Sequence, residues 1–268
     1  MLYRSAVFGG LETLQARFVK FSFVPHSHAE YTVGLIEQGA QRFRYRGAQH
    51  FTPPQGFFVL HPGESHTGAA VDEKGFKYRA FYPGPELMRL ALNDCSQSSH
   101  TLPYFQEAVQ SDPELSRGLL ELLQSLPNLP LLEAETRVLV WLRHLLRRGG
   151  FNRPPADSRE PRAILEARAF LEAHSVNAVS ILELSNRVGL SPFYFTRIFT
   201  KAVGLPPHAY HENVRIRKAK RLLEQGLTLP EVAFLTGFSH QSHFTNRFRR
   251  HVGVSPGRYQ QSKIAQDT

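Results

Sequence analysis

The sequence predicts an α+β protein of two domains. The first is a β-rich N-terminal domain followed by helices, and the second is an all-helical C-terminal domain. Three observations support this: short alternating strands before residue 82, a proline-rich break near residue 155, and a pattern in 181–256 that occurs twice. With 268 residues, the chain is long enough for two cores, and we place the domains at 1–155 and 156–268.

The composition is that of a folded protein, with 41% hydrophobic and 11% aromatic residues. The sequence contains no apolar run of about 18 residues and no charged start followed by an apolar stretch. We therefore expect neither a membrane span nor a secretion signal. Cys95 is the only cysteine, so an intrachain disulfide is excluded, and a reducing, cytoplasmic location is expected.

The first 82 residues contain several segments of the length and alternation of strands. Residues 41–47 alternate strictly, with three arginines on one face and two aromatic residues on the other. The predicted strands are 18–23, 32–36, 41–47, 56–60 and 76–82. Many short strands at this spacing predict a small barrel or sandwich.

Two loops between these strands are rich in histidine, at 25–31 and 61–66. The candidate ligand-binding residues in them are His26, His28, Glu30, Tyr31 and His66. His26 and His28 lie two residues apart, which places both imidazoles on one face of an extended segment. We favour a small-molecule pocket. There are two alternatives: a metal site formed by His26, His28 and His66, or histidines that only make ordinary hydrogen bonds. No cofactor is expected.

Helices are predicted at 85–92, 115–126 and 131–146. The last has an apolar stripe at helical spacing, formed by Leu132, Val138, Leu139, Leu142, Leu145 and Leu146. This stripe either packs against the strands or joins two chains. Residues 149–161 have three prolines and almost no apolar periodicity, so they are predicted to be the linker.

The C-terminal domain begins with an amphipathic helix at 162–174, and a first helix-turn-helix unit is predicted at about 180–204. Ser180 and Glu183 have the spacing of a capping box, and Gly189 is suited to the turn. Ser191 with Pro192 is typical of the start of the next helix. In that helix the spacing makes Phe195, Ile198 and Phe199 core residues. Pro192, Phe193, Thr196, Arg197 and Thr200 fall on the other side, which is either a DNA-reading face or an ordinary surface.

A second unit follows at about 228–253, with Gly237 48 residues after Gly189. Thr228 is its predicted cap, and Ser239 takes the position of Ser191. Its second helix has Phe244 and Phe248 toward the core. The exposed side is predicted to hold His240, Gln241, Ser242, Thr245, Asn246 and Arg249.

Basic residues are concentrated in this half of the chain. Residues 160–268 hold 15 Lys and Arg against 8 Asp and Glu, whereas 1–159 hold 17 against 15. A helix at 213–225 joins the two units and is especially basic, with Arg215, Arg217, Lys218, Lys220 and Arg221. These basic residues either contact DNA phosphates or form an ordinary solvent-exposed surface. The asymmetry favours nucleic acid as the partner.

Residues 237–248 (GFSHQSHFTNRF) and 253–259 (GVSPGRY) closely resemble the signature of the AraC/XylS family of transcriptional regulators. Carried over by position, the family's base-reading residues correspond to Phe193, Thr196, Arg197, Gln241, Ser242, Thr245 and Asn246. Asn246 stands where an arginine is common, and Gln260 replaces a usual closing arginine. The resemblance implies binding to double-stranded DNA, with homodimerisation and contact with RNA polymerase also implied.

The N-terminal half resembles the cupin-like barrel that senses ligands in many such regulators. The cupin glutamate does not follow His28 at the usual distance, and the second histidine loop is shortened between Pro62 and Gly63. We therefore predict a non-enzymatic, sequence-specific transcription regulator controlled by a small molecule. The competing interpretations are a metal-dependent cupin enzyme with a DNA-binding tail and a ligand-independent DNA binder.

Overall fold

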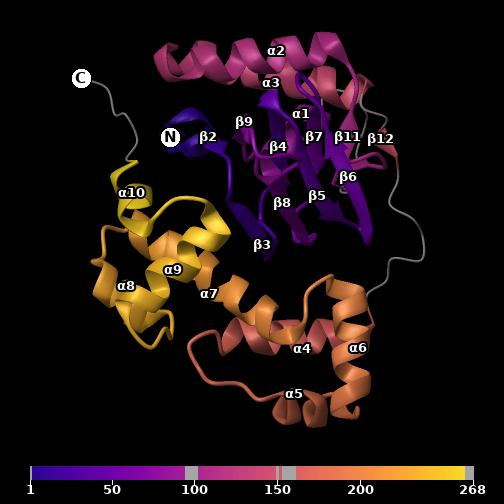
Figure 1. Cartoon of the computed structure of the whole chain (residues 1–268), viewed down its shortest axis with the longest axis vertical. Helices are drawn as coiled ribbons and strands as arrows, with labels where there is room; N and C mark the ends of the chain where they lie inside the picture. The colour runs from indigo at the N-terminus through magenta and orange to yellow at the C-terminus, as the bar shows by residue number, and fades with distance from the viewer. Residues whose placement is uncertain (1, 94–101, 149–150, 153–160, 263–268) are drawn as a thin grey trace.

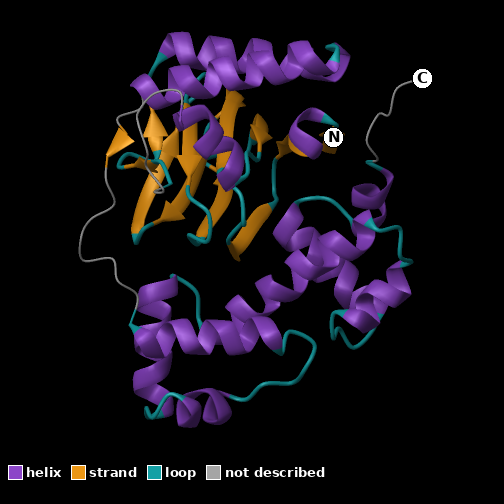
Figure 2. Cartoon of the chain, turned by 180° about the vertical axis from the view of Figure 1, so that it is seen from behind, coloured by secondary structure: helices purple, strands orange, loops and turns teal. Residues whose placement is uncertain are grey.

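The computed structural model describes residues 2–93, 102–148, 151–152 and 161–262. Figure 1 shows helices α2 and α3 above the strands, helices α4–α7 below them and helices α8–α10 to their lower left. Figure 2 shows the same arrangement from behind. The predicted two-domain α+β arrangement is confirmed. Of the helices in the described ranges, none is long and apolar enough to cross a membrane.

The β domain consists of two antiparallel sheets. One has the strand order β1-β2-β9-β4-β7-β11, and the other has the order β3-β8-β5-β6. Their strands are β1 (Leu2–Ser5), β2 (Leu11–Phe18), β3 (Ser22–His26), β4 (Thr32–Gly39), β5 (Gln41–Tyr45), β6 (Ala48–Thr52), β7 (Phe57–Leu60), β8 (His66–Ala70), β9 (Phe76–Phe81) and β11 (Val109–Gln110). A short 3-10 helix, Val7–Gly9, separates β1 from β2.

The predicted strand at 18–23 is wrong, because these residues contain the end of β2, a bend and the start of β3. Phe18, Phe21 and Phe23 pack on one another there, with ring centroids 4.9–5.2 Å apart. Their aromatic character produced a strand-like pattern across the bend. The other four predicted strands are present in the structure.

Three helices cover the outer face of the six-stranded sheet: α1 (Pro85–Asn93), α2 (Pro113–Ser125) and α3 (Leu131–Arg148). A 3-10 turn, Leu126–Asn128, joins α2 to α3. The predicted stripe of α3 is mostly correct, but Leu132 is 78% exposed. Trp141, which was not part of the predicted stripe, is buried instead. Its indole N–H donates to the carbonyl of Leu115 at 3.1 Å.

Two residues of the predicted linker belong to the β domain. Strand β12 (Phe151–Asn152) pairs antiparallel with β10 (Tyr104–Phe105). Most of the predicted linker, including the domain boundary placed at residue 155, lies outside the described residues. Cys95 also lies outside them.

The helical domain contains the two predicted helix-turn-helix units. Its helices are α4 (Arg162–Ala173), α5 (Ile181–Arg187), α6 (Pro192–Val203), α7 (Pro207–Glu224), α8 (Leu229–Leu235), α9 (Gln241–Val252) and α10 (Pro256–Gln261). Gly189 and Gly237 have φ of 67° and 73° in equivalent turns, a conformation that favours glycine. The connecting helix α7 begins at Pro207, earlier than the predicted start at residue 213.

The helix caps of the two units agree with the sequence at most positions. The hydroxyl of Ser180 accepts from the N–H of Glu183, but the complete capping box is formed by Thr228 and Glu231. Ser239 is not the cap of α9. His240 takes that place, with its ring accepting from the N–H of His243 at 3.1 Å.

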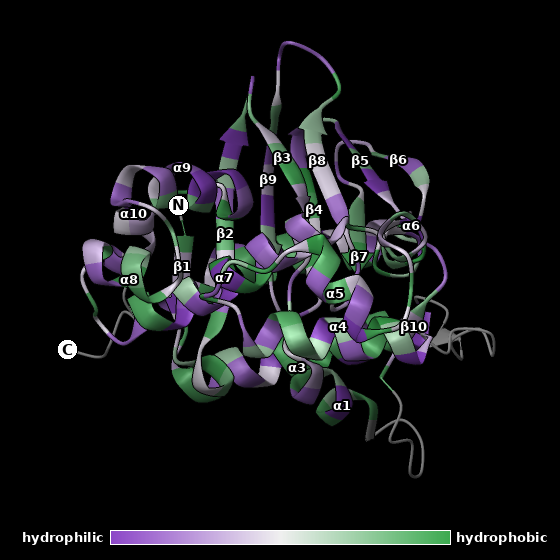
Figure 3. Cartoon of the chain, turned by 90° about the horizontal axis from the view of Figure 1, so that it is seen from below, coloured by the Kyte–Doolittle hydropathy of each residue, from purple (hydrophilic) through white to green (hydrophobic). Residues whose placement is uncertain are grey.

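The two units differ in how they attach to the β domain. The first has a core of its own, built by α4, α5, α6 and the start of α7. The second shares one apolar cluster with the space between the two sheets, in which Ile216, Phe244 and Phe248 belong with Phe43 and Phe58. Helices α7 and α9 both contact β3. Figure 3 shows α8–α10 beside β1 and β2, with α6 at the other end of α7.

Charged groups cross the same junction. Lys220 of α7 lies 3.1 Å from Glu12 of β2, and both side chains are largely buried. The hydroxyl of Tyr259 donates to Glu224 at 2.8 Å and lies 3.2 Å from Glu12, and Arg4 pairs with Glu224 at 2.7 Å. Burial opposes the charge of Lys220, but the carboxylates of Glu12 and Glu30 raise its pKa above the ordinary value.

Replacing Glu12 is expected to weaken the junction. Glu12→Gln leaves the ammonium of Lys220 without its charged partner, so the free energy of unfolding should fall by about 1.5–3 kcal/mol in a denaturant titration followed by circular dichroism. Glu133→Gln removes an exposed ion pair with Arg137 on α3. It should change the free energy of unfolding by less than about 0.5 kcal/mol. Equal effects of the two substitutions would show that the buried pair contributes no more than a surface pair.

Candidate nucleic-acid interface and interdomain cavity

The outer face of α6 carries the three residues predicted to read bases in the first unit. Phe193 is 81% exposed, although it is a large apolar side chain. The hydroxyl of Thr196 donates to the carbonyl of Pro192 at 2.8 Å, which satisfies this polar group within the helix. The guanidinium of Arg197 lies 5.3 Å from the ring centroid of Tyr194, which restrains the arginine at the surface.

The outer face of α9 carries the second set. Gln241, Ser242, Asn246 and Arg249 are exposed and Thr245 is half-buried, while Phe244 and Phe248 are buried on the opposite side. The hydroxyl of Ser242 lies 3.1 Å from Nδ1 of His240. The structure therefore places all eight predicted DNA-binding residues on α6 and α9, facing away from the cores.

Helix α7 separates the two recognition helices. It has 18 residues, so it is roughly 27 Å long at 1.5 Å per residue. Figures 1 and 3 both show α6 and α9 at opposite ends of it. Successive major grooves on one face of DNA repeat about every 34 Å, so the length of α7 is comparable with one turn of the duplex.

Three of the five basic residues of α7 are paired with other parts of the protein. Arg215 donates to the carbonyls of Ser175, Asn177 and Gly237 at 2.7–3.0 Å. Arg217 pairs with Glu172 at 3.3 Å, and Lys220 pairs with Glu12. In this arrangement these three do not offer the phosphate contacts considered from the sequence. Arg221 is exposed and Lys218 is half-buried.

A cavity of about 1250 Å³ lies between the β domain and helices α7 and α9. His26, His28, Glu30 and His66 line it, as the sequence predicts. Tyr31 does not, so this part of the prediction is wrong. Tyr31 is buried on the side of the sheet that faces the helices, where its hydroxyl donates to the carbonyl of Pro103 at 2.7 Å.

Strand pairing brings His26 and His66 together, because they are direct partners in the β3–β8 ladder. Nδ1 of His26 donates to the carbonyl of Val24 at 2.7 Å, and Nδ1 of His66 donates to the carbonyl of Glu64 at 3.2 Å. The ring centroid of His28 lies 4.9 Å from that of His26 and 5.2 Å from that of His66. Burial lowers the pKa of His66 to about 4 and those of His26 and His28 well below 6.5, so all three are neutral at pH 7.

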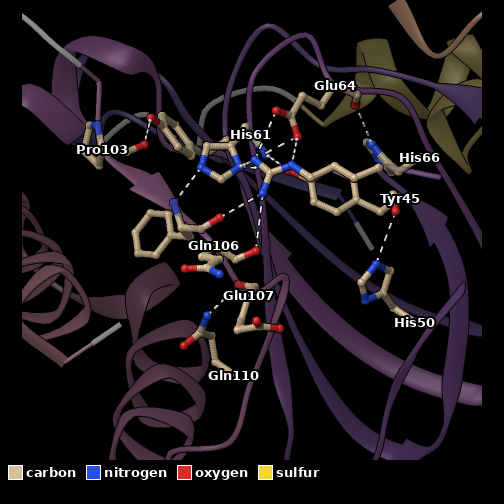
Figure 4. Close-up of polar contacts among 12 residues, drawn as sticks. Tyr45, His50, His61, Glu64, His66, Pro103, Gln106, Glu107 and Gln110 are labelled. Atoms are coloured by element: carbon tan, nitrogen blue, oxygen red, sulfur yellow. Dashed lines mark hydrogen bonds and ion pairs between the residues drawn. The ribbon is translucent and has the colours of Figure 1, made fainter. Parts of the chain in front are cut away.

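A buried network fixes the loop that ends at His66 (Figure 4). The N–H of Phe105 lies 2.9 Å from Nε2 of His61, and the Tyr45 hydroxyl and the Arg46 guanidinium lie 2.8 Å and 2.9 Å from its Nδ1. Burial lowers the pKa of His61 to about 4. Arg46 pairs with Glu64 at 2.7 Å and donates to the carbonyl of Phe105 at 3.0 Å. His61 therefore positions the loop and lies outside the cavity lining.

Several residues that line the cavity were not identified from the sequence: Arg4, Gln41, Asn213, Lys220 and His251. They come from strands and helices far apart in the chain, so local sequence holds no signal that they meet. The side-chain oxygen of Gln41 is buried without a hydrogen-bond partner among the described residues, and so is Nδ1 of His251. The amide of Asn213 donates to the hydroxyl of Ser27 at 3.3 Å, across the domain junction.

Comparison with known proteins agrees with this division into two domains. The model of the AraC-like ligand binding domain matches residues 8–140, and that of the helix-turn-helix domain matches residues 184–262. The chain is 32% identical to the uncharacterized HTH-type transcriptional regulator YbfI of Bacillus subtilis over 238 residues, which cover 87% of this chain and 85% of that protein. It is 27% identical to the HTH-type transcriptional activator RhaS of Escherichia fergusonii over 281 residues, covering 94% of this chain and 92% of that one.

Solved structures of ToxT from Vibrio cholerae have a similar fold. An apo form superposes with a TM-score of 0.61 at 10% identity, covering 94% of this chain and 97% of that one. A form bound to an unsaturated fatty acid gives 0.61 at 11% identity, covering 96% and 98%.

Both relatives are named as transcriptional regulators. The matched ligand-binding domain contains most of the β-domain wall of the cavity, and the matched helix-turn-helix domain contains both recognition helices. This chain therefore belongs to the AraC family of transcriptional regulators, with an N-terminal ligand-binding domain and a C-terminal helix-turn-helix DNA-binding domain.

Proposed function

We propose that this regulator reads a specific operator with α6 and α9 and that a small molecule in the interdomain cavity controls this binding. The observation that carries the proposal is the lining of the cavity. Its wall includes strands of the β domain and also His251 of the recognition helix α9. A ligand there contacts both domains, so it binds differently to arrangements in which they are differently placed.

The exposed side chains of the recognition helices suit direct readout of base edges. Arg197 matches the two acceptors of guanine, and Gln241 or Asn246 matches the donor and acceptor of adenine. Phe193 supplies an apolar surface for a thymine methyl group. Thr196, Ser242, Thr245 and Arg249 complete the proposed set of contacts.

Removing the guanidinium of Arg197 should reduce specificity more than general affinity. On an operator selected in vitro from random DNA, Arg197→Ala should weaken binding by about 1–3 kcal/mol, or roughly 5–150-fold, and relax preference at one base position. Arg197→Lys retains the charge without the bidentate fork and should lose specificity while keeping affinity for unrelated DNA. Arg17→Ala, at an exposed arginine of β2, is the control. Equal losses on all sequences would place Arg197 on phosphate.

The lining of the cavity indicates the kind of effector. Aromatic and aliphatic side chains such as Phe43, Phe58 and Leu60 lie beside charged groups, among them Lys220 and Glu30. The oxygen of Gln41, which has no hydrogen-bond partner in the described part of the chain, offers an acceptor to a bound molecule. We propose an amphipathic small molecule with at least one hydrogen-bond donor.

A screen of metabolites by thermal shift tests the effector site. A ligand present at about 100 times its dissociation constant should stabilise the protein by about 2.7 kcal/mol. Gln41→Leu removes an acceptor that has no partner among the described residues, so the fold should persist while the shift decreases. Gln49→Leu, at an exposed site on the neighbouring strand β6, should retain the shift. A ligand that binds in the cavity without changing operator affinity would support a ligand-independent DNA binder.

We also propose a homodimer formed through the outer face of α3, where Leu131, Leu132 and Val140 are exposed. Membership of the family supports contact with RNA polymerase and action in the cytoplasm as parts of the same proposal.

The dimer is tested by analytical ultracentrifugation. Leu132→Glu should shift the protein toward the monomer, because it places a charge in the apolar contact. Val19→Glu, at an exposed apolar residue in the β2–β3 bend, should leave the dimer intact. A wild-type protein that sediments as a monomer at micromolar concentration would overturn the proposal.

A further inference from the structure

We propose that the histidines of the cavity bind one divalent transition-metal ion, and that the ion joins the β domain to the recognition helix α9 through His251. The ligands are His26, His28 and His66 from the β domain and Nδ1 of His251 from the helical domain. This inference goes beyond the proposed function, and it is independent of whether DNA is bound.

The first three ligands lie close to one another. Each offers one ring nitrogen, and these nitrogens all lie within 4.8 Å of one another. Nitrogen ligands of a tetrahedral Zn²⁺ ion, each about 2.0–2.1 Å from it, are separated by about 3.4 Å. The rings therefore need to approach by at most about 1.4 Å, a movement within the reach of small side-chain rotations.

The hydrogen bonds of the His26, His66 and His251 rings leave one nitrogen of each ring available. In His26 and His66, Nδ1 donates to a backbone carbonyl, so Nε2 carries the lone pair. In His251, Nε2 donates to the carboxylate of Glu212 at 2.8 Å, so Nδ1 carries it. A ring nitrogen that donates to a carbonyl or carboxylate is the usual outer-shell arrangement of metal-binding histidines.

His251 provides an observation independent of the three-histidine group. Its side chain is only 4% exposed and lines the cavity, yet its Nδ1 has no hydrogen-bond partner among the described residues. A buried polar atom without a partner is costly. Its ring centroid lies 6.2 Å from that of His26, whereas two imidazoles on one tetrahedral ion have centroids about 5 Å apart. A closure of about 1 Å brings His251 to the ion.

The surrounding charges allow a cation to bind. Lys220 is the nearby ammonium that acts on His26 and His28, and its charge is countered by Glu12 at 3.1 Å. Glu30 also lines the cavity and adds negative charge. Imidazole ligands without thiolates suit Zn²⁺, Ni²⁺ or Cu²⁺ better than Mg²⁺ or Ca²⁺.

A metal at this position has a consequence for DNA recognition. His251 lies in the last turn of α9, the helix that carries Gln241, Ser242, Thr245 and Asn246. An ion bound to both domains holds α9 against β3. It favours whichever arrangement of the recognition helices has His251 at the ion.

Isothermal titration of the metal-free full-length chain with ZnCl₂ tests the proposal. The chain must carry no polyhistidine tag. The wild type should bind one ion per chain, and both His66→Ala and His28→Ala should abolish this binding. His251→Ala should retain one ion with affinity reduced about tenfold or more. His144→Ala and His208→Ala, at exposed histidines of α3 and α7, are matched controls and should bind as the wild type does.

Titration with Co²⁺ reports the geometry directly, because tetrahedral Co²⁺ absorbs strongly in the visible range. The wild type should show this absorption, and His251→Ala should weaken or shift it. Circular dichroism checks that each variant folds. If His66→Ala does not fold, His28→Ala provides the test, because His28 is only half-buried. Zn²⁺ binding that survives both substitutions would overturn the site. Unchanged affinity and an unchanged Co²⁺ spectrum in His251→Ala would overturn the link to α9.

Discussion

The arrangement of this protein depends on α7 packing against two partners at once. Ile216, Ala219 and Leu223 belong to the same apolar cluster as residues between the two sheets, and Lys220 on the same helix pairs with Glu12 of β2. The apolar residues supply most of the attraction, and the ion pair selects the register because its charges are costly to bury unmatched. As a result, the second helix-turn-helix unit is continuous with the β domain, whereas the first has its own core.

This asymmetry gives the cavity its character. A pocket enclosed by one sheet pair would be lined by the β domain alone, but here one wall is α7 and the end of α9. Polar and charged side chains from both domains meet there, beside the apolar side chains of Phe43, Phe58 and Leu60. A molecule or ion that satisfies Gln41 and His251 acts on the junction itself, where the placement of α9 is decided.

Local patterns predicted the helical domain well. Caps, glycine turns and buried phenylalanines recur within some ten residues of each other, so Ser180, Gly189, Phe195 and Phe199 were assigned correctly. The β domain was less predictable. Strands β1, β2, β6 and β8 and the two-residue strands β10, β11 and β12 were missed. Strand β8 has the sequence HTGAA, which lacks the apolar alternation of a half-buried strand.

The site depended on contacts that the sequence does not reveal. The His-rich loops gave four of the five cavity residues, because histidines two apart share a face in any extended segment. Tyr31 was misplaced, because the chain turns at the start of β4 and directs this ring to the helices. The basic residues of α7 were expected to face solvent or phosphate. Their acidic and carbonyl partners lie about 20–45 residues away or in another domain, so the local sequence does not reveal them. His251 carried no signal without the docking of α9 on β3.

Arg215 fixes the spacing of the two recognition helices. Its guanidinium ties the loop after α4, at Ser175 and Asn177, to the turn of the second unit at Gly237. The two helices therefore have little freedom to adjust their separation to the pitch of a duplex. In the proposed readout by both helices, any mismatch between that separation and the groove spacing is taken up by bending the DNA. Base pairs between the two half-sites, which neither helix touches, then contribute to operator choice through their flexibility.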